Sequence, residues 1–600
     1  MPSYTAPVRD IQFILHELLK IERYQGVLAG FDEATPETVA AILEGAAQIS
    51  QEVLQPLNKS GDREGCRLEN GKVTTPTGYK EAYKALIEGG WTGLIGDPHH
   101  GGQGLPYVLG LMVNEMMASA NMAFTMYPGL TSGAIEAIEI GGTDEQKALY
   151  LPRMIAGQWS GTMNLTEPHC GTDLGLLRTK AEPQSDGTYR ITGTKIFISA
   201  GEHDLTENII HLVLAKIPGG PEGVKGISLF IVPKFLVNPD GSLGDRNGVS
   251  CGSIEEKMGI HSNSTCVMNY DGAVGYLLGE EHKGLRTMFI MMNAARLGVA
   301  VQGVSQAEVA YQNAVAYCKD RVQGRSLRGA KFPDKPADPI IVHPDIRRML
   351  MTVRVFQEGA RALAGWAGLM VDVTRKHPDE ETRRKAEDLL GLLTPVMKAY
   401  FTDMGFTSAN LCLQCFGGHG YIAEWGMEQF VRDARIAQIY EGANGIQALD
   451  LIGRKLPANK GRAIQLLFAV IGEFCEKYED NAALSPFVKP LTEALERLVE
   501  ATQWLMQHAI SNPDNGGAVS MDYLYMMALV TLGYQWAQVA RICENQLSNP
   551  DDDSFDRAFY QHKLVCAEFF MEKMLPETMA HLAKLQAGAD SLMTLPADAF

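Results

Sequence analysis

The segment MNLTEPHCGTDLG, residues 163–175, lies where the chain changes from helical to strand-like sequence. Its residue types suit a turn whose backbone approaches a ligand. Thr166 offers a hydroxyl, Pro168 stiffens the turn, and Gly171 has no side chain that would keep a ligand away. Thr172 adds a hydroxyl next to backbone N–H groups, which suits a phosphate. By itself the segment equally fits a polar β-turn, so the surrounding sequence must decide between these interpretations.

The sequence pattern on both sides of this segment predicts the order of the domains. Apolar residues three and four apart precede it, which is typical of helices. Short runs rich in Ile, Val, Phe and Thr follow it, such as NIIHLVLAKI at residues 208–217, and predict a β domain. Long helical patterns then return, at about residues 284–322, 344–376 and 380–415. We therefore expect a mostly α chain with a central β domain, in five segments: an N-terminal helical extension, a helical domain, the β domain, a helical bundle and a further helical domain, at residues 1–35, 36–160, 161–280, 281–457 and 458–600. Within the last segment, NPDNGGA, residues 512–518, is expected to be a loop.

The composition excludes several classes of function. A net charge of −18 repels phosphate backbones, so no nucleic-acid partner is expected. No apolar run suggests a membrane-spanning helix, and the N-terminus resembles neither a signal peptide nor a transit peptide. The ten cysteines are scattered, which suits a reducing cytoplasm. The Cys412/Cys415 pair and the adjacent His99 and His100 lack further ligands nearby, so no metal site is predicted.

Three further segments add residue types that suit a nucleotide-like cofactor. GTKIFISAG, residues 193–201, presents the aromatic Phe197 and the hydroxyl of Ser199. KDRVQGRS, residues 319–326, contains Arg321, whose planar guanidinium suits a pyrophosphate. QCFGGHG, residues 414–420, combines Gln414 with Gly417, Gly418 and Gly420 at the end of a predicted helix. Each of these alone is weak, since Phe197 also fits a strand core and glycines commonly end helices.

An isolated acid stands in the apolar segment AQIYEGANG, residues 437–445. Glu441 lies between Tyr440 and Gly442, and the two glycines Gly442 and Gly445 oppose a regular helix. A carboxylate that caps a helix end or faces solvent would account for the acid. A general base in a dry site is the other interpretation.

In combination and order, these segments resemble the acyl-CoA dehydrogenase family, over roughly residues 40–455. The T-E-P-x-x-G-[ST]-D core of the family is intact at residues 166–173. The resemblance implies an FAD cofactor, which would contact Met163, Leu165, Thr166, Gly171, Thr172, Phe197, Ser199, Arg321, Gln414, Gly417 and Gly418. Phe197 would cover the flavin ring and Ser199 would lie near its N5 edge, where many members have Trp and Thr. Gln414 and its glycines would contact the adenosine-diphosphate half of a neighbouring subunit's cofactor.

The resemblance also implies the reaction. Glu441 would remove the α-proton of an acyl-CoA while a hydride leaves the β-carbon for the flavin, which gives a trans-2-enoyl-CoA. Tyr440, Gly442 and Arg296 would lie at the substrate. Some members carry the base on an earlier helix, but the matching position here is Ala295, so no residue other than Glu441 is expected to act as the base.

The length of the chain resembles a long bacterial branch of the family, which acts on fatty acyl-CoA in β-oxidation or on 3-(methylthio)propanoyl-CoA. We expect a homodimer, with an electron-transfer flavoprotein as the electron acceptor. An acyl-CoA oxidase would share these motifs and stays an alternative, as does a scaffold that binds flavin or acyl-CoA without catalysis.

Overall fold

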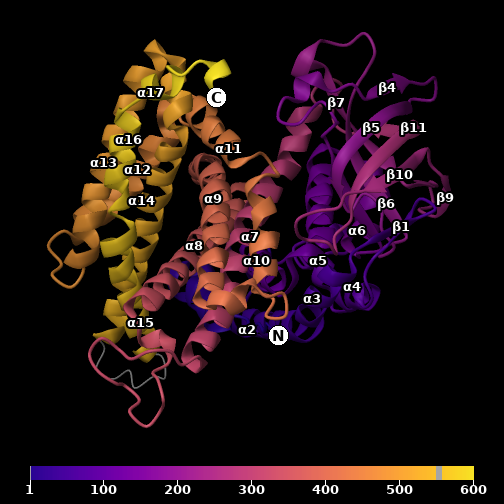
Figure 1. Cartoon of the computed structure of the whole chain (residues 1–600). Helices are drawn as coiled ribbons and strands as arrows, with labels where there is room; N and C mark the ends of the chain where they lie inside the picture. Colours follow the sequence, from indigo (N-terminus) through magenta and orange to yellow (C-terminus); the bar gives the residue numbers. More distant parts are fainter. Residues whose placement is uncertain (1, 549–556) are drawn as a thin grey trace. The chain divides into compact units, whose positions relative to one another are not determined.

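The helix–strand–helix order expected from the sequence is present in the computed structural model of the chain, which describes residues 2–548 and 557–600 (Figure 1). The chain divides into two compact units, each assembled from separate stretches of sequence. The β unit comprises Glu44–Leu105 and Met116–Gly298, and the helical unit comprises Met1–Leu43, Pro106–Glu115 and Val299–Phe600. The five segments predicted from the sequence do not correspond one to one to these units, and their limits stay a prediction.

A seven-stranded sheet forms the centre of the β unit. Its pairings run β11–β5–β4–β6–β7 and return to β11, so five strands close on themselves, while β10 and β3 lie outside this ring. Only the β3–β6 and β4–β6 pairs are parallel. The strands are β3 (Trp159–Asn164), β4 (Lys180–Pro183), β5 (Tyr189–Ser199), β6 (Asn208–Lys216), β7 (Ile227–Pro233), β10 (Val249–Ile254) and β11 (Thr265–Leu277).

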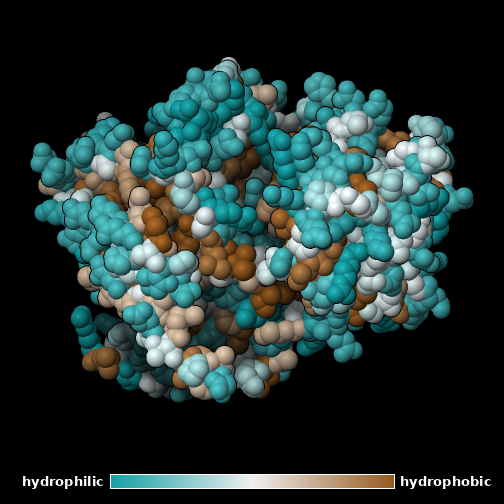
Figure 2. Space-filling view, turned by 90° about the horizontal axis from the view of Figure 1, so that it is seen from above, coloured by the Kyte–Doolittle hydropathy of each residue, from teal (hydrophilic) through white to brown (hydrophobic). Residues whose placement is uncertain are grey.

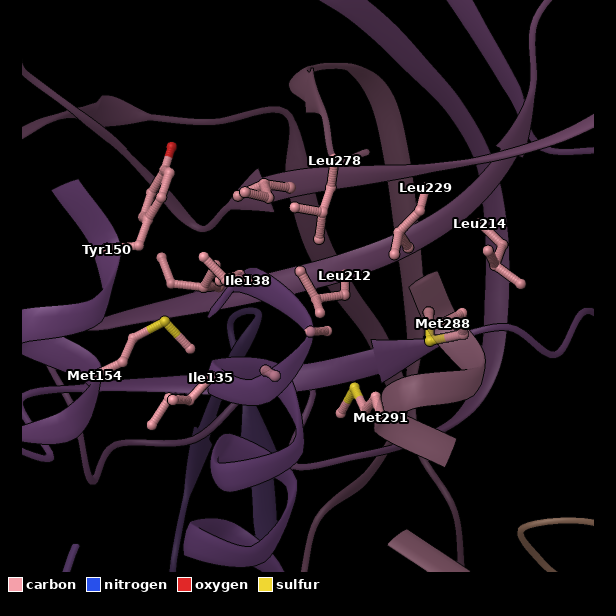
Figure 3. Close-up of a cluster of buried hydrophobic side chains, with 14 of the residues drawn as sticks. Ile135, Ile138, Tyr150, Met154, Leu212, Leu214, Leu229, Leu278, Met288 and Met291 are labelled. Carbon is pink, nitrogen blue, oxygen red and sulfur yellow. The ribbon is translucent and has the colours of Figure 1, made fainter. Parts of the chain in front are cut away.

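The core of the β unit follows from strand periodicity. Successive side chains of a strand point to opposite faces, and both faces of β6 are buried. Leu212 and Leu214 belong to a cluster with α5, α6 and the first turns of α7, whereas Val213 and Ala215 face a second cluster with other strands. Figure 3 shows the first cluster, in which Ile135, Met154 and Met288 approach the strand side chains from three helices. The 163–175 segment therefore leaves β3 from a sheet that is buried on both sides.

The remaining elements of the β unit are helices and short hairpins. The helices are α3 (Gln55–Glu64), α4 (Tyr79–Glu88), most of α5 (Tyr107–Gly141), α6 (Asp144–Ile155) and the start of α7 (Gly284–Asp320). One hairpin, β1 (Arg67–Glu69) with β2 (Lys72–Thr74), lies in a region for which we predicted only helices, and β8 (Phe235–Val237) pairs with β9 (Leu243–Arg246).

The helical unit contains long antiparallel helices from the middle and the end of the chain. In it α8 packs along α9, and α14 packs against α13, α15 and α16 (Figure 1). Its helices are α1 (Val8–Gln12), the rest of α7, α8 (Pro344–Lys376), α9 (Glu380–Cys415), α10 (Met427–Arg435), α11 (Asn444–Asp450), α12 (Arg462–Tyr478), α13 (Ser485–Ser511), α14 (Pro513–Leu547), α15 (Arg557–Phe569), α16 (Glu577–Gln586) and α17 (Asp590–Met593). The helix α2 (Pro36–Gln48) begins in the helical unit, and its end, from Glu44, belongs to the β unit.

Two expectations from the sequence were wrong. Residues 513–518 are the start of α14 and not a loop, because Asn512 caps the helix by accepting from the Asp514 N–H at 3.1 Å and Pro513 takes the first helical position. In addition, α7 is long and apolar enough to cross a membrane by length and composition, against our expectation of no such run. Just over half of the most apolar 18-residue stretch of α7 is buried within the protein, as in a core helix of a globular protein.

The face shown in Figure 2 is mostly hydrophilic, with smaller hydrophobic areas between the hydrophilic residues.

Candidate active site

The predicted site residues fall into three groups, each contained in one unit. The 163–175 segment, Phe197 and Ser199 belong to the β unit, together with Arg296. Arg321 and the 414–418 segment form a second group in the helical unit, and Glu441 with its neighbours forms the third, also in the helical unit.

In the first group, the 163–175 segment and β5 are joined through their backbones. The N–H of Ile196 donates to the carbonyl oxygen of Thr166 at 2.9 Å. Next to this bond the pairing of β5 with β11 contains a bulge, between the partners Cys266 and Met268. A bulge places two residues of one strand opposite one of the other and redirects the side chains.

Phe197 lies in this bulge and has the geometry of a ligand-facing residue. Its φ of +59° is in the left-handed region, which is rare for a bulky side chain. Although it is aromatic and part of a buried sheet, 60% of its surface is exposed. An exposed ring held in strained backbone is expected where a flat ligand completes the packing.

A buried ion pair that the sequence analysis did not identify supports the same segment. The Lys195 Nζ donates to the Leu165 carbonyl and to the Glu167 Oε1, each at 2.9 Å. Glu167 also accepts from the N–H groups of Arg178 and Thr179 and from the Thr179 hydroxyl. The T-E-P motif contains this glutamate, and a lysine in the apolar strand pattern of β5 was the signal that could have identified its partner.

The two charges of this pair respond differently to burial. Burial lowers the pKa of Lys195 to about 8, because two acceptors only partly replace its water. The pKa of Glu167 lies below its usual value, since burial is outweighed by the Lys195 charge and by several donors. The pair therefore joins β5 to the 163–175 segment through both the Leu165 carbonyl and the Glu167 carboxylate.

The second group lies where α7 and α9 end. An aromatic cluster joins the two ends: the Tyr317 ring stacks on Phe416 at 4.1 Å, and its hydroxyl is 2.9 Å from the Nδ1 of His419. The His419 ring stacks in turn on Trp425. The Arg321 N–H donates to the Tyr317 carbonyl, so this cluster brings the exposed Arg321 and the exposed Gln414, Gly417 and Gly418 to one place.

The third group is the 439–443 loop, between the 3-10 turn Ile436–Gln438 and α11. Glu441 has a φ of +58°, again in the left-handed region, and its Oε2 is buried. Gly442 follows at φ +87°, where a Cβ would lie 2.5 Å from the Gln447 Nε2. The loop therefore requires glycine at 442 and keeps a glutamate at 441 in spite of the strain.

Buried polar side chains hold this loop in place. The Lys398 Nζ of α9 donates to the Gly442 carbonyl and to the Asn444 Oδ1, both at 2.8 Å. The Gln447 Nε2 donates to the carbonyls of Glu441 and Gly442 at 3.2 Å. Lys398 and Gln447 have no exposed surface, so these bonds are shielded from water. The supporting side chains of Lys398, Asn444 and Gln447 were not predicted from the sequence.

The two other predicted substrate residues differ in their surroundings. The Tyr440 hydroxyl donates to the Gln302 Oε1 of α7, and burial together with the Glu441 charge raises the pKa of Tyr440 above its usual value. Arg296 is buried in the β unit, where its Nη1 donates to the Asn293 Oδ1 at 3.3 Å. The expected roles of both residues stay predictions.

Each of the first two groups, taken by itself, has residue types that suit part of a flavin dinucleotide. A Cβ added to Gly171, Gly417 or Gly418 would meet nothing within 4 Å, so their backbones are open to a ligand. Phe197 supplies an exposed ring and Arg321 an exposed guanidinium. Across residues 2–548 and 557–600, no cluster of three or more His, Cys, Asp or Glu side chains could hold a metal ion.

Comparison with known proteins identifies the class. Profiles of the acyl-CoA dehydrogenase N-terminal, middle and C-terminal domains match residues 36–158, 162–273 and 282–456, and an acetyl-CoA dehydrogenase C-terminal-like profile matches residues 467–596. The chain belongs to the acyl-CoA dehydrogenase family, enzymes that oxidise acyl-CoA with a flavin. The expected fold class and the FAD cofactor are thereby confirmed.

Individual relatives cover the full length. The chain is 43% identical over 596 residues to 3-methylmercaptopropionyl-CoA dehydrogenase of Ruegeria pomeroyi, covering 99% of each chain. It is 32% identical to a broad-specificity linear acyl-CoA dehydrogenase of Mycobacterium tuberculosis, covering 100% of each chain. A solved acyl-CoA dehydrogenase of Bacillus anthracis complexed with FAD shares the fold at a TM-score of 0.74 and 22% identity, covering 92% of this chain and 89% of that one.

Proposed function

We propose that the protein dehydrogenates an acyl-CoA at its α,β-bond to trans-2-enoyl-CoA, with Glu441 as the base that removes the α-proton. The observation that carries this proposal is the 439–443 loop. A glutamate at φ +58° is held in place by buried side chains of α9 and α11, although glycine or asparagine would fit that backbone with less strain. Such strain persists where the position of the side chain serves a function.

The chemistry requires a carboxylate at a fixed position. The α-proton of a thioester is a very weak acid, and its removal needs a base in a water-poor site and donors at the carbonyl oxygen. In the proposed step the α-C–H bond breaks and its proton passes to the Glu441 carboxylate. The electron pair of that bond forms the new double bond as a hydride leaves the β-carbon. The bound flavin supplies the hydride acceptor. The Glu441 N–H is the protein donor that we propose for the carbonyl oxygen.

The test replaces Glu441 by Gln, which keeps size and removes the basic carboxylate. Glu441→Gln should fold, hold FAD and bind acyl-CoA, but flavin reduction on anaerobic mixing should slow by roughly a hundred- to ten-thousand-fold. Glu387→Gln, at an exposed position of α9, controls for the loss of one charge and should reduce its flavin normally. Bleaching of the Glu441→Gln flavin at wild-type speed would refute the proposal, as would a wild type that binds acyl-CoA without any bleaching.

For the substrate, we propose straight-chain acyl-CoA in fatty-acid β-oxidation. A second candidate is 3-(methylthio)propanoyl-CoA, which the full-length similarity to the Ruegeria pomeroyi enzyme supports. Comparison of kcat/KM across acyl-CoA chain lengths and the methylthio compound decides between them.

We further propose a cytoplasmic homodimer that passes its electrons to an electron-transfer flavoprotein. The resemblance of the 414–420 segment to a motif that contacts the neighbouring subunit's cofactor supports the dimer. The exposed Tyr421 and Ile422 beside it, 84% and 50% exposed, offer an apolar contact surface. Sedimentation of the holoenzyme tests the assembly. Hydrogen peroxide formed in air at the rate of substrate turnover would indicate an oxidase instead.

A further inference from the structure

The 439–443 loop is connected to the C-terminal helices through one carboxylate, that of Asp403 on α9. Its Oδ1 accepts from the Gln438 Nε2 and from the Asn444 Nδ2, each at 2.7 Å. Gln438 immediately precedes the loop and Asn444 immediately follows it. Asp403 therefore holds both ends of the five residues that contain Glu441.

The other oxygen of this carboxylate is bound from α14. The Tyr525 hydroxyl donates to the Asp403 Oδ2 at 2.7 Å. The Tyr525 ring packs edge-on against Tyr400 of α9, with centroids 5.1 Å apart, and also lies 5.3 Å from the His581 ring of α16. Because ring packing on two sides restricts its side-chain torsions, the direction of the hydroxyl is set by its contacts with α9 and α16.

The strength of this connection follows from charge and burial. A hydrogen bond to a carboxylate contributes more than one between neutral groups. Burial, followed by the Asp403 charge, raises the pKa of Tyr525 above its usual value, so its hydroxyl stays protonated and donates. Rotation of the Asp403 carboxylate would misalign the bonds to Gln438 and Asn444 at once.

We propose that Tyr525 is a positioning residue for the reaction, acting through Asp403 on the loop that carries Glu441. The C-terminal helical domain, residues 467–596 by its family profile, thereby takes part in catalysis without contacting substrate. This inference rests on the proposed role of Glu441.

The test compares two tyrosines of the same helix. Tyr525→Phe removes the hydroxyl and keeps the ring packing. Tyr523→Phe is the matched control, because the Tyr523 hydroxyl bonds to the Thr502 Oγ1 of α13, at 2.8 Å, and not to Asp403. Both variants lose one hydrogen bond of a tyrosine hydroxyl, and of the two tyrosines only Tyr525 bonds to Asp403. The holoenzymes are mixed anaerobically with butanoyl-CoA and with 3-(methylthio)propanoyl-CoA, and flavin reduction is followed at saturation.

We expect Tyr525→Phe to lower the limiting rate of flavin reduction about tenfold, with unchanged FAD content and substrate Kd. A displacement of a catalytic group by about 1 Å can cost up to a hundredfold. The isotope effect with α-deuterated substrate should rise, because proton removal is the step that is slowed. Tyr523→Phe should keep the wild-type rate. Equal rates for the two variants would overturn the proposal.

Two further variants make the test complete. Asp403→Asn should slow flavin reduction at least as much as Tyr525→Phe does. The double variant Tyr525→Phe, Asp403→Asn should be no slower than Asp403→Asn, because Tyr525 acts through Asp403. Multiplicative effects would contradict that dependence. Glu441→Gln is measured in parallel: if it reduces flavin normally, the proposed function fails, whereas an inactive Glu441→Gln with a normal Tyr525→Phe refutes the positioning role alone.

Discussion

Glu441 and Phe197 share an unusual property, since each is a side-chain-bearing residue in left-handed backbone at a position expected to be functional. This conformation costs roughly 1–2 kcal/mol relative to ordinary backbone for residues other than glycine. The surrounding hydrogen bonds must overcome that cost in both places. Function and stability therefore oppose each other at these two residues.

This opposition gives a prediction at Glu441. Glu441→Gly should unfold at a higher temperature than Glu441→Ala, by an amount that corresponds to about 1 kcal/mol, because only glycine relieves the strain at φ +58°. Both variants should fail to reduce flavin. Thermal unfolding of the two proteins, each loaded with FAD, is the measurement. A Glu441→Ala protein at least as stable as Glu441→Gly would show that the strain is absent.

The sequence identified these residues by type, but not the side chains that support them. Glu441 stood out because it is an acid in an apolar segment. Its backbone conformation depends on Lys398, which is distant in the sequence, and on Gln447, which lies in an ordinary helical pattern. Lys398 interrupts the apolar run LLTPVMKAYF, residues 392–401, which was the available signal for a buried partner.

Among the elements, β5 and the segment after β3 form the surface at which we expect the flavin to bind. The bulge at Phe197 and the Glu167–Lys195 pair act on adjacent stretches of backbone. A rigid, buried strand on one side and a charge-supported turn on the other leave little freedom to the residues between them. Such rigidity lowers the entropy lost when a ligand binds.

We therefore expect Glu167→Gln to weaken FAD binding selectively. Glu202→Gln is the matched control, because Glu202 is an equally buried carboxylate of the β unit that pairs with Lys234 and Arg246. Removal of one partner of a buried pair typically costs 3–5 kcal/mol, so both variants should be less stable. Only Glu167→Gln should raise the Kd for FAD, measured by fluorescence titration of the apoprotein. Equal FAD affinities would contradict the supporting role.

The polar face of β3 predicts an acid response of the β unit. Ser160 and Thr162 bond to His203 and His211, and burial lowers the pKa of each histidine from 6.5 to about 3. Below pH 6.5 these two histidines are protonated in the unfolded chain but stay neutral in the folded chain. The contribution of these histidines to stability is therefore complete above pH 6.5 and is lost as the pH falls toward 3.

Urea unfolding at pH 7 and pH 5 measures this response. The wild type should lose up to about 1.4 kcal/mol per pH unit for each histidine over this range. His211→Gln should reduce the slope, and His562→Gln, at an exposed position of α15, is the control. An identical slope in wild type and His211→Gln would show that His211 is not kept neutral by burial.

Element boundaries were predictable where a helix has clear ends. The predicted ranges 344–376 and 380–415 coincide with α8 and α9, where prolines and polar residues separate long apolar periodicities. The start of α14 was missed because Asn, Pro, Asp and Gly serve both as turn residues and as helix-starting residues. The closed pairing of β7 with β11 involves contacts too distant in sequence for any local pattern to indicate.

At the scale of the whole chain, the added segments at both ends connect to the family core through buried charges within the helical unit. Arg361 of α8 is 1% exposed and pairs with Asp10 of α1, Glu115 of α5 and Glu308 of α7. Lys563 of α15 pairs with Asp10 as well. One ionic cluster thus joins the N-terminal extension, three core helices and the C-terminal domain.

The cluster is sensitive to the loss of its central cation. Burial already raises the pKa of Glu115 above its usual value, despite the Arg361 charge beside it. In Arg361→Met, three carboxylates would face one another with less compensation. We expect this variant to lose roughly 3–5 kcal/mol of stability at neutral pH, as is typical when one partner of a buried pair is removed.

The pH dependence distinguishes this electrostatic loss from a packing defect. In Arg361→Met the folded state should hold protons on these carboxylates that the unfolded chain releases above about pH 4.5. Its stability should therefore fall as the pH rises from about 4.5 toward neutral, and part of the loss should disappear at pH 5. Arg348→Met removes an exposed pair with Asp345 on the same helix and should cost less than about 1 kcal/mol at either pH. The contrary outcome in urea unfolding is the same loss of stability for Arg361→Met at pH 5 and at pH 8. In that case the cluster contributes through packing and not through charge, and the two added segments are connected to the core by packing alone.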